Sequence, residues 1–190
     1  MFLFDVETLG TESKSVILSA AAIYFNPEEK PNFQQLLDSA FFIKFNSKEQ
    51  IEVYNRTVSQ STLDWWASQP PETKHLSFKP KADDLSAVDG IQKFHDWIKS
   101  FSDYNKSTVW ARGNLDQLVL HSLENDVKVE TLFPFWQWRD VRTAVDILTG
   151  SSRGYCAVNY PGFDVRTVVK HNPIHDCAYD AMMLMYGESQ

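Results

Sequence analysis

Met1-Phe2-Leu3-Phe4-Asp5-Val6-Glu7-Thr8-Leu9-Gly10 opens the chain as an apolar run that ends in two carboxylates spaced two residues apart. A strand directs alternate side chains to opposite faces, so Asp5 and Glu7 project from one face if residues 1–7 form a strand. Two like charges this close repel unless something neutralises them, and divalent metal ions commonly do so in proteins. The alternative is a strand that simply ends in solvent with polar residues. Further acidic residues elsewhere in the chain would favour a metal site over a strand that simply ends in solvent.

Composition describes an ordinary globular protein. The 190 residues are 43% hydrophobic and 23% charged, which predicts one domain over residues 1–190 with a sizeable core. No segment approaches the roughly 18 consecutive apolar residues of a membrane span, and the opening residues lack the basic start of a signal peptide. Cys156 and Cys177 are too far apart for a Cys-x-x-Cys element, which favours a reducing compartment. We therefore expect a soluble cytoplasmic protein without a membrane partner.

The net charge limits the kinds of nucleic-acid binding that are expected. A charge of −7 argues against tracking along long nucleic acid, because such binding depends on many contacts from Lys and Arg to phosphates. It allows an enzyme that holds one or two phosphates through metal ions.

Hydrophobic patterning predicts a mixed sheet with helices on its faces. Residues 1–7, 16–25 and 40–45 read as three strands joined by short turns, which is typical of an antiparallel meander. Two further strands, 107–111 and 135–141, alternate with helices. The expected helices cover residues 61–67, 86–101, 116–123, 142–148 and 177–186, the last with Asp176 as N-cap and Gly187 after its end. The pattern predicts one sheet in an α/β or α+β arrangement.

Three further side chains with metal-site chemistry lie near junctions between the expected elements. Asp116 opens the helix after the fourth strand, and the last helix carries Asp180, with His175 five residues before it. With Asp5 and Glu7, these residues make four carboxylates and one histidine. Two-metal phosphoryl transfer needs this inventory: hard oxygen ligands for the ions, and one base that titrates near neutral pH.

The order of these motifs resembles the DEDDh branch of the DnaQ-like 3′-5′ exonucleases, whose fold is RNase H-like. The motifs are Asp5-Val6-Glu7-Thr8, Gly113-Asn114-Leu115-Asp116 and His175-Asp176-Cys177-Ala178-Tyr179-Asp180. Within the superfamily, the chain looks most similar to the bacteriophage exonuclease A group and related small bacterial exoribonucleases, so the expected location is the host cytoplasm if the chain is phage-encoded. The similarity to this group depends on three further elements: Trp65-Trp66, Trp110-Ala111-Arg112-Gly113-Asn114 and Arg139-Asp140-Val141-Arg142. Leu115 departs from many relatives, which have an aromatic residue before the second-motif aspartate.

The resemblance implies an α/β fold with a five-stranded mixed sheet and a defined set of roles. It implies that two Mg²⁺ or Mn²⁺ ions are held by Asp5, Glu7, Asp116 and Asp180, and that His175 is the general base. It also places Thr8 and Leu9 under the terminal nucleotide of the substrate.

Two further side chains are candidates for substrate binding. Trp65 is a candidate for stacking on bases, with core packing as the alternative. Arg112 is a candidate for phosphate contact, with an ordinary solvated arginine as the alternative.

We expect a metal-dependent 3′-5′ exonuclease that acts on single-stranded 3′ ends and releases 5′ mononucleotides. DNA and RNA both remain open as substrates, because no motif identifies a group that reads the 2′ hydroxyl. One alternative is a catalytically silent RNase H-like binding or assembly module, which would be free to lose its acidic residues. Another is a proofreading subunit bound to a polymerase. The aromatic content leaves room for a homodimer.

Overall fold

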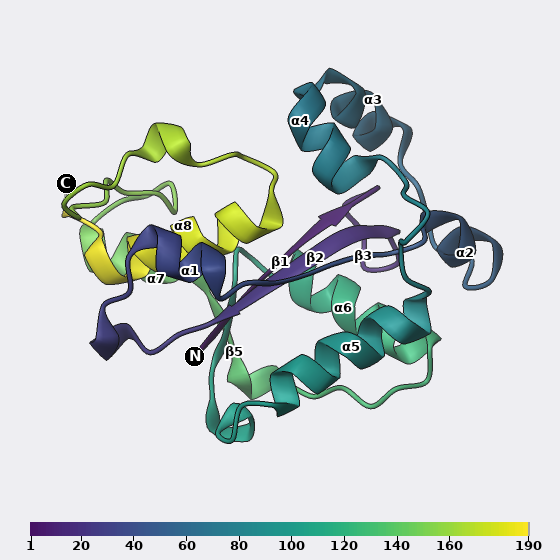
Figure 1. The fold of residues 1–190 in the computed structure, drawn as a ribbon, viewed down its shortest axis with the longest axis horizontal. Helices are drawn as coiled ribbons and strands as arrows, with labels where there is room; N and C mark the ends of the chain where they lie inside the picture. Colours follow the sequence, from purple (N-terminus) through teal and green to yellow (C-terminus); the bar gives the residue numbers. More distant parts are fainter. Residues whose placement is uncertain (190) are drawn as a thin grey trace.

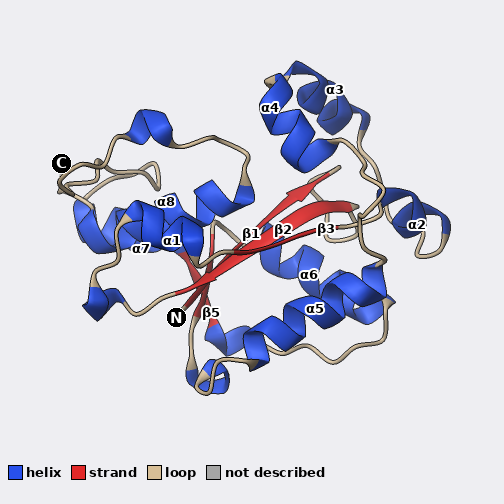
Figure 2. Cartoon of the chain, viewed as in Figure 1, coloured by secondary structure: helices blue, strands red, loops and turns tan. Residues whose placement is uncertain are grey.

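A five-stranded mixed sheet forms the centre of the computed structural model, which describes residues 1–189 (Figures 1 and 2). The strand order is β3-β2-β1-β4-β5. The strands are β1 (Phe2–Thr8), β2 (Ile17–Tyr24), β3 (Phe41–Lys44), β4 (Val109–Ala111) and β5 (Trp138–Asp140). The first three strands form the expected antiparallel meander, and β4 and β5 add in parallel on the other side of β1. The expected α/β class with a five-stranded mixed sheet is confirmed.

Alternation along β1 separates two cores, one on each face of the sheet. Phe2, Phe4 and Val6 pack with the helices α5 (Ala87–Lys99) and α6 (Leu115–Asp126). Leu3 lies on the opposite face, with α1 (Phe33–Asp38), α7 (Val141–Thr149) and α8 (Pro173–Tyr186). The helices thus cover both faces of the sheet (Figure 1). Asp5 and Glu7 are in phase with Leu3, so they point toward the α8 side.

Several boundaries differ from the sequence-based expectation. The helices α1 and α2 (Ser47–Glu52) were not predicted, because each has only six residues and too few turns to show a clear apolar stripe. Residues 135–137 form a 3₁₀ turn, so the fifth strand is shorter than predicted. The prediction of Asp176 as the N-cap of the last helix was wrong. Helix α8 begins one turn earlier, with Asn172 as N-cap and Pro173 at the first helical position.

A small helical segment covers the carboxyl end of β1. It consists of α3 (Gln60–Ser68), α4 (Pro71–Thr73) and the π-helical turn η2 (Lys74–Phe78), which lie beyond the end of β1 in Figure 1. Trp66 is fully buried there, in a third cluster with Leu9, Val16 and Leu18. Among the helices of residues 1–189, none is both long and apolar enough to cross a bilayer.

Candidate active site

The first strand supplies two carboxylates to one cavity. Asp5 and Glu7 occupy alternate positions of β1 and therefore share a face of the sheet. The pairing of β1 with β2 is regular up to Glu7 and shifts between Glu7 and Thr8, where the strand ends. Glu7 is only 8% exposed, so its carboxylate lies in a largely dry environment at the end of the strand.

The junction between β4 and α6 supplies a third carboxylate. The chain turns at Gly113, whose φ of +87° lies in the region that glycine adopts without strain. The Gly113 amide donates to Asp140 Oδ1 at 2.9 Å, which ties the turn to the neighbouring strand β5. Asp116 follows in the first turn of α6 and is buried. This turn directs Asp116 back toward the end of β1.

Helix α8 supplies two more carboxylates from one face. Asp176 and Asp180 are one helical turn apart, so both point toward the sheet. All five acidic residues line one cavity of about 450 Å³ between β1, α6 and α8. We call it the acidic pocket; its other lining residues include Arg112, Arg142, Tyr155, His171 and Tyr179.

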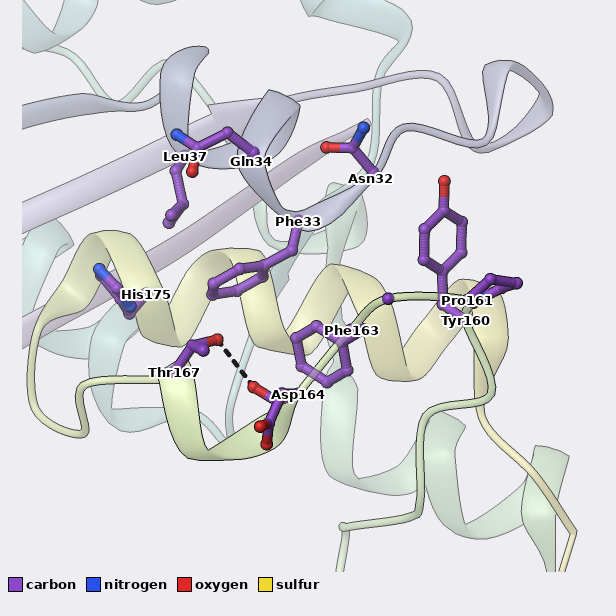
Figure 3. A pocket seen from close by; sticks show the side chains of 11 residues that line it. Asn32, Phe33, Gln34, Leu37, Tyr160, Pro161, Phe163, Asp164, Thr167 and His175 are labelled. Atoms are coloured by element: carbon purple, nitrogen blue, oxygen red, sulfur yellow. Dashed lines mark hydrogen bonds between the residues drawn. The ribbon is translucent and has the colours of Figure 1, made fainter.

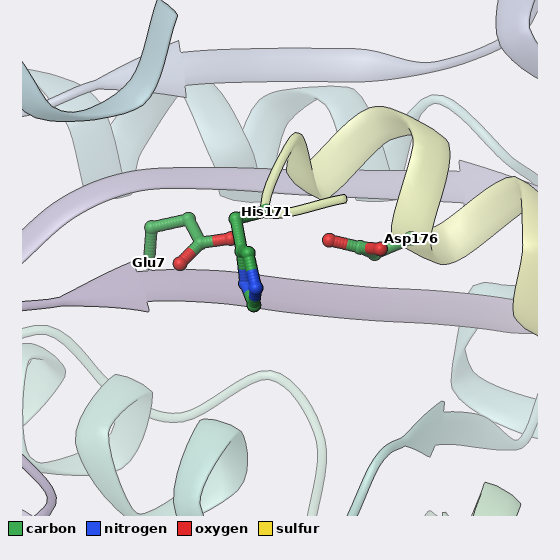
Figure 4. Close-up of side chains that lie close together, drawn as sticks. All are labelled: Glu7, His171 and Asp176. Carbon is green, nitrogen blue, oxygen red and sulfur yellow. The ribbon is translucent and has the colours of Figure 1, made fainter. Parts of the chain in front are cut away.

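His171 is the histidine that lies among these acidic groups. One potential ligand atom from each of Glu7, His171 and Asp176 lies within 4.8 Å of the others, close enough for a metal ion to bind all three (Figure 4). His171 is not in a helix; it sits in the turn before α8 with a φ of +60°. The sequence-based prediction missed both His171 and Asp176 as site residues.

Burial and mutual repulsion keep protons on several of these carboxyl groups. Burial, and then the charge of Asp180, raise the pKa of Asp116 to about 7. The same two causes raise the pKa of Asp176 to about 7. The pKa values of Asp5 and Glu7 are raised well above their ordinary range, mainly by burial and then by neighbouring carboxylates. Two arginines, Arg112 and Arg142, also line the pocket, but two positive charges cannot balance five ionised carboxylates.

Comparison with known proteins gives the family. The model of the Rv2179c-like 3′-5′ exoribonuclease domain matches residues 1–187. The chain is also 34% identical to an exodeoxyribonuclease of Enterobacteria phage T4, over 203 aligned positions that cover 98% of this chain and 88% of the phage protein. The chain belongs to the Rv2179c-like 3′-5′ exoribonuclease family. The expected resemblance to DnaQ-like exonucleases of the phage group is confirmed, and so is the expected enzyme class, a 3′-5′ exonuclease.

Asp180 has a different environment from the other acids of this Rv2179c-like pocket. Arg112 donates to it from two nitrogens, with Nε 3.1 Å from Oδ1, and the two side chains form an ion pair. The same guanidinium donates through Nη1 to the Gly154 carbonyl at 2.7 Å and lies 4.1 Å from the centre of the Tyr155 ring. Arg112 is therefore engaged by the protein itself, and among the residues that the structure describes it gives Asp180 an ion pair that the other pocket acids do not have.

His175 lies outside the acidic pocket of this Rv2179c-like chain. It lines a separate cavity of about 580 Å³ between α1, α8 and residues 160–167, where it lies edge-on to Phe33 (Figure 3). Its Nδ1 accepts a hydrogen bond from the Val169 amide at 3.2 Å. One residue along a helix is a rotation of about 100°, so Asp176 can face the sheet while His175 faces α1.

Three other residues were predicted to contact the substrate: Thr8, Leu9 and Trp65. The structure places them in different environments. Thr8 is partly exposed and donates through Oγ1 to the Gly10 carbonyl at 2.6 Å. Leu9 is only 6% exposed and packs against Trp66, so its side chain does not reach the acidic pocket. Trp65 is 39% exposed and lies edge-on to His171, with ring centres 4.7 Å apart.

The chain contains a signal for the pair that the sequence analysis missed. His171 and Asp176 have four residues between them, the same spacing as His175 and Asp180. Two overlapping copies of one motif are therefore present in residues 171–180. Spacing alone does not show which copy faces the acidic pocket. The start of α8 at Pro173 does, because it leaves His171 in the turn before the helix and places His175 within it.

Proposed function

We propose that this 3′-5′ exonuclease removes nucleotides from the 3′ ends of single-stranded DNA, RNA or both, and releases 5′ mononucleotides. The observation that carries the proposal is the convergence of Asp5, Glu7, Asp116, Asp176 and His171 on one cavity. Both substrate classes are supported by the comparisons, because the matching family is named for an exoribonuclease and the phage relative for an exodeoxyribonuclease.

The acidic pocket fits divalent cations. Asp5 Oδ2 is buried and has no hydrogen-bond partner among the described residues, and an unpaired buried acceptor is costly. We propose that Asp5, Glu7, Asp116 and Asp176 hold two ions, Mg²⁺ or Mn²⁺, since carboxylate oxygens are the ligands that both prefer. When bound, such ions supply charge neutralisation at the phosphate and lower the pKa of a water ligand.

His171 is the proposed general base, in place of His175. Burial lowers the pKa of His171, and so does the neighbouring charge of Lys170, so its imidazole is neutral at pH 7 and can accept a proton. In the proposed reaction, His171 takes a proton from the attacking water as the water oxygen bonds to phosphorus. The bond from phosphorus to the 3′ oxygen of the preceding nucleotide breaks, and the 5′ mononucleotide is released. The 3′ oxygen gains a proton from solvent and becomes the new 3′ hydroxyl, and His171 returns its proton to solvent.

Digestion of end-labelled oligonucleotides tests the proposal. Purified protein with Mg²⁺ or Mn²⁺ should shorten 5′-labelled DNA or RNA oligonucleotides stepwise from the 3′ end. Matched DNA and RNA of one sequence show which sugar is preferred. An Asp5→Asn protein prepared in the same way should be inactive; equal activity in that variant would assign the reaction to a contaminant. Folded wild-type protein that leaves both substrates at full length would contradict the proposal and favour a silent binding module.

The proposal also covers the domain organisation, the location and the oligomeric state of the protein. A single exonuclease domain over residues 1–190 is supported by the family match over 1–187. A cytoplasmic location is supported by the two free, buried cysteines. A homodimer is supported by two neighbouring exposed apolar side chains near the end of α7, Ile147 and Leu148. Light scattering of the purified protein would test the last, because a monomeric mass at micromolar concentration contradicts it.

A further inference from the structure

One helical segment contacts both sides of the acidic pocket. Residues 59–78, which contain α3, α4 and η2, are joined to the end of β1 by two hydrogen bonds. Trp66 Nε1 donates to the Thr8 carbonyl at 2.9 Å, and the Ser59 amide donates to the Leu9 carbonyl at 2.7 Å. Trp66 also stacks on Phe78 of the same segment, with ring centres 5.5 Å apart. The segment is thus fixed to the residue that follows Glu7.

The same segment contacts His171 at two points. Trp65 meets the imidazole at an interplanar angle of 89° with ring centres 4.7 Å apart, an arrangement in which the edge of one ring faces the other. Ser77 Oγ donates to the His171 carbonyl at 3.1 Å. Ser77 is fully buried, so this hydrogen bond satisfies a hydroxyl that would otherwise be unpaired. One contact is with the side chain of His171 and the other is with its backbone.

The backbone of His171 needs such support. Its φ of +60° lies in the left-handed region, which costs a residue with a Cβ atom about 1 to 2 kcal/mol. Conformations of this kind persist where surrounding contacts hold them. Without those contacts, the turn before α8 would relax to ordinary backbone angles and carry the imidazole away from Glu7 and Asp176.

We propose that Trp65 and Ser77 are positioning residues that hold His171 against Glu7 and Asp176. The segment is also hydrogen-bonded to Thr8, so it sets the position of His171 relative to β1. It thereby links the motif that contains Asp5 and Glu7 to the motif that contains His171 and Asp176. The inference rests on the proposed function where it concerns the rate of hydrolysis. The placement of His171 is independent of that function.

Steady-state kinetics distinguish two roles for Trp65: positioning of His171 and stacking on a substrate base. Trp65→Leu should lower kcat about 10- to 100-fold with KM nearly unchanged, because a displacement of about 1 Å at a reacting group can cost about 100-fold. Trp65→Phe keeps an aromatic edge and should restore most of kcat. Trp136→Leu is the control, since Trp136 is 62% exposed and its ring contacts Phe135 rather than His171. A Trp65→Leu protein with raised KM and wild-type kcat would overturn the proposal and show that Trp65 binds substrate.

Histidine NMR tests the placement without activity. The protein has five histidines, so selectively labelled, metal-free samples give few signals, and His171→Gln identifies the one of interest. Ser77→Ala leaves the nearby rings unchanged and should shift or broaden the His171 ring signals, while those of His95 and His121 stay in place. Wild-type His171 signals in folded Ser77→Ala would overturn the proposal. If the wild type proved inactive on every substrate, the proposed function would fail, and this measurement would still decide the positioning claim.

Discussion

Arg112 and Asp180 form an ion pair inside the acidic pocket, with Arg112 Nε 3.1 Å from Asp180 Oδ1. Within residues 1–189, Asp180 has this ion pair, whereas Asp5, Glu7, Asp116 and Asp176 form none. The protein thus binds a cation directly to Asp180 and leaves the other four acids of the pocket without one.

Asp176→Asn should be far more damaging to activity than Asp180→Asn. Asp176 lies in the group with Glu7 and His171, where loss of a proposed ligand should lower kcat on the order of 100-fold or more, because metal-ion stabilisation of developing charge is worth several kcal/mol. Asp180→Asn leaves that group intact and should keep much more of the wild-type rate. Initial rates at saturating Mn²⁺ measure both variants. The assignment is wrong if Asp180→Asn is the more damaging change.

Arg112→Ala should destabilise the protein through the charge that it leaves behind. Removing one partner of a buried ion pair costs about 3 to 5 kcal/mol, because the other charge stays desolvated. It would also release the Gly154 carbonyl and the Tyr155 ring. Urea unfolding measures the free energy of unfolding. The double variant Arg112→Met/Asp180→Leu provides the control and should recover part of the loss, whereas equal or additive losses would show that the charge pair is not the cause.

Much of the fold follows from the sequence because strand alternation and helical periodicity act over many residues. Such patterns predicted β1, the antiparallel meander and α5. The alternation along β1 also predicted that Asp5 and Glu7 lie on one face of the sheet. The position of His171 in the acidic pocket was not predicted, for a local reason. His171-x4-Asp176 and His175-x4-Asp180 have identical spacing, and the choice depends on where α8 begins and on which face each residue then occupies. The ion pair was also missed, because it joins residues 68 positions apart through side chains alone.

His171→Gln and His175→Gln should have opposite outcomes. General base catalysis typically contributes about 100- to 10,000-fold, so His171→Gln should lower kcat within that range. His175→Gln should leave kcat close to that of the wild type, because His175 lines the cavity behind α8 and contacts Phe33 rather than the acidic residues. Single-turnover rates on one oligonucleotide compare the two proteins directly. A large loss in His175→Gln alone would restore the sequence-based assignment.

The stability of the metal-free protein should fall as the pH rises from 6.5 to 8. Asp116 and Asp176 have folded-state pKa values raised to about 7, mainly by burial. Their protonated forms favour the folded state, so their contribution is fully present below about pH 4 and is lost as the pH rises through 7. His171 and His175, with lowered pKa values, act in the opposite sense below pH 6.5, which sets the lower end of the window.

The expected loss over this window is on the order of 1 kcal/mol. Urea unfolding in EDTA at several pH values measures the free energy of unfolding. The double variant Asp116→Asn/Asp176→Asn lacks these two carboxyl groups and should show a flatter profile, with the slope that remains due to Asp5 and Glu7. A wild-type profile that is flat, or that rises between pH 6.5 and 8, would contradict the raised pKa values.

Mg²⁺ should stabilise the folded protein at pH 8, where the pocket acids are most ionised. A ligand that binds the folded state alone stabilises it by about 2.7 kcal/mol at 100 times its Kd, so Tm should rise with Mg²⁺ concentration and return to its starting value in excess EDTA. Glu7→Gln should reduce the rise because it removes one carboxylate of the cluster. Glu188→Gln, a change at an exposed acid near the C-terminus, is the matched control and should respond like the wild type. An equal Mg²⁺ response in Glu7→Gln and the wild type would place the bound ions outside the acidic pocket.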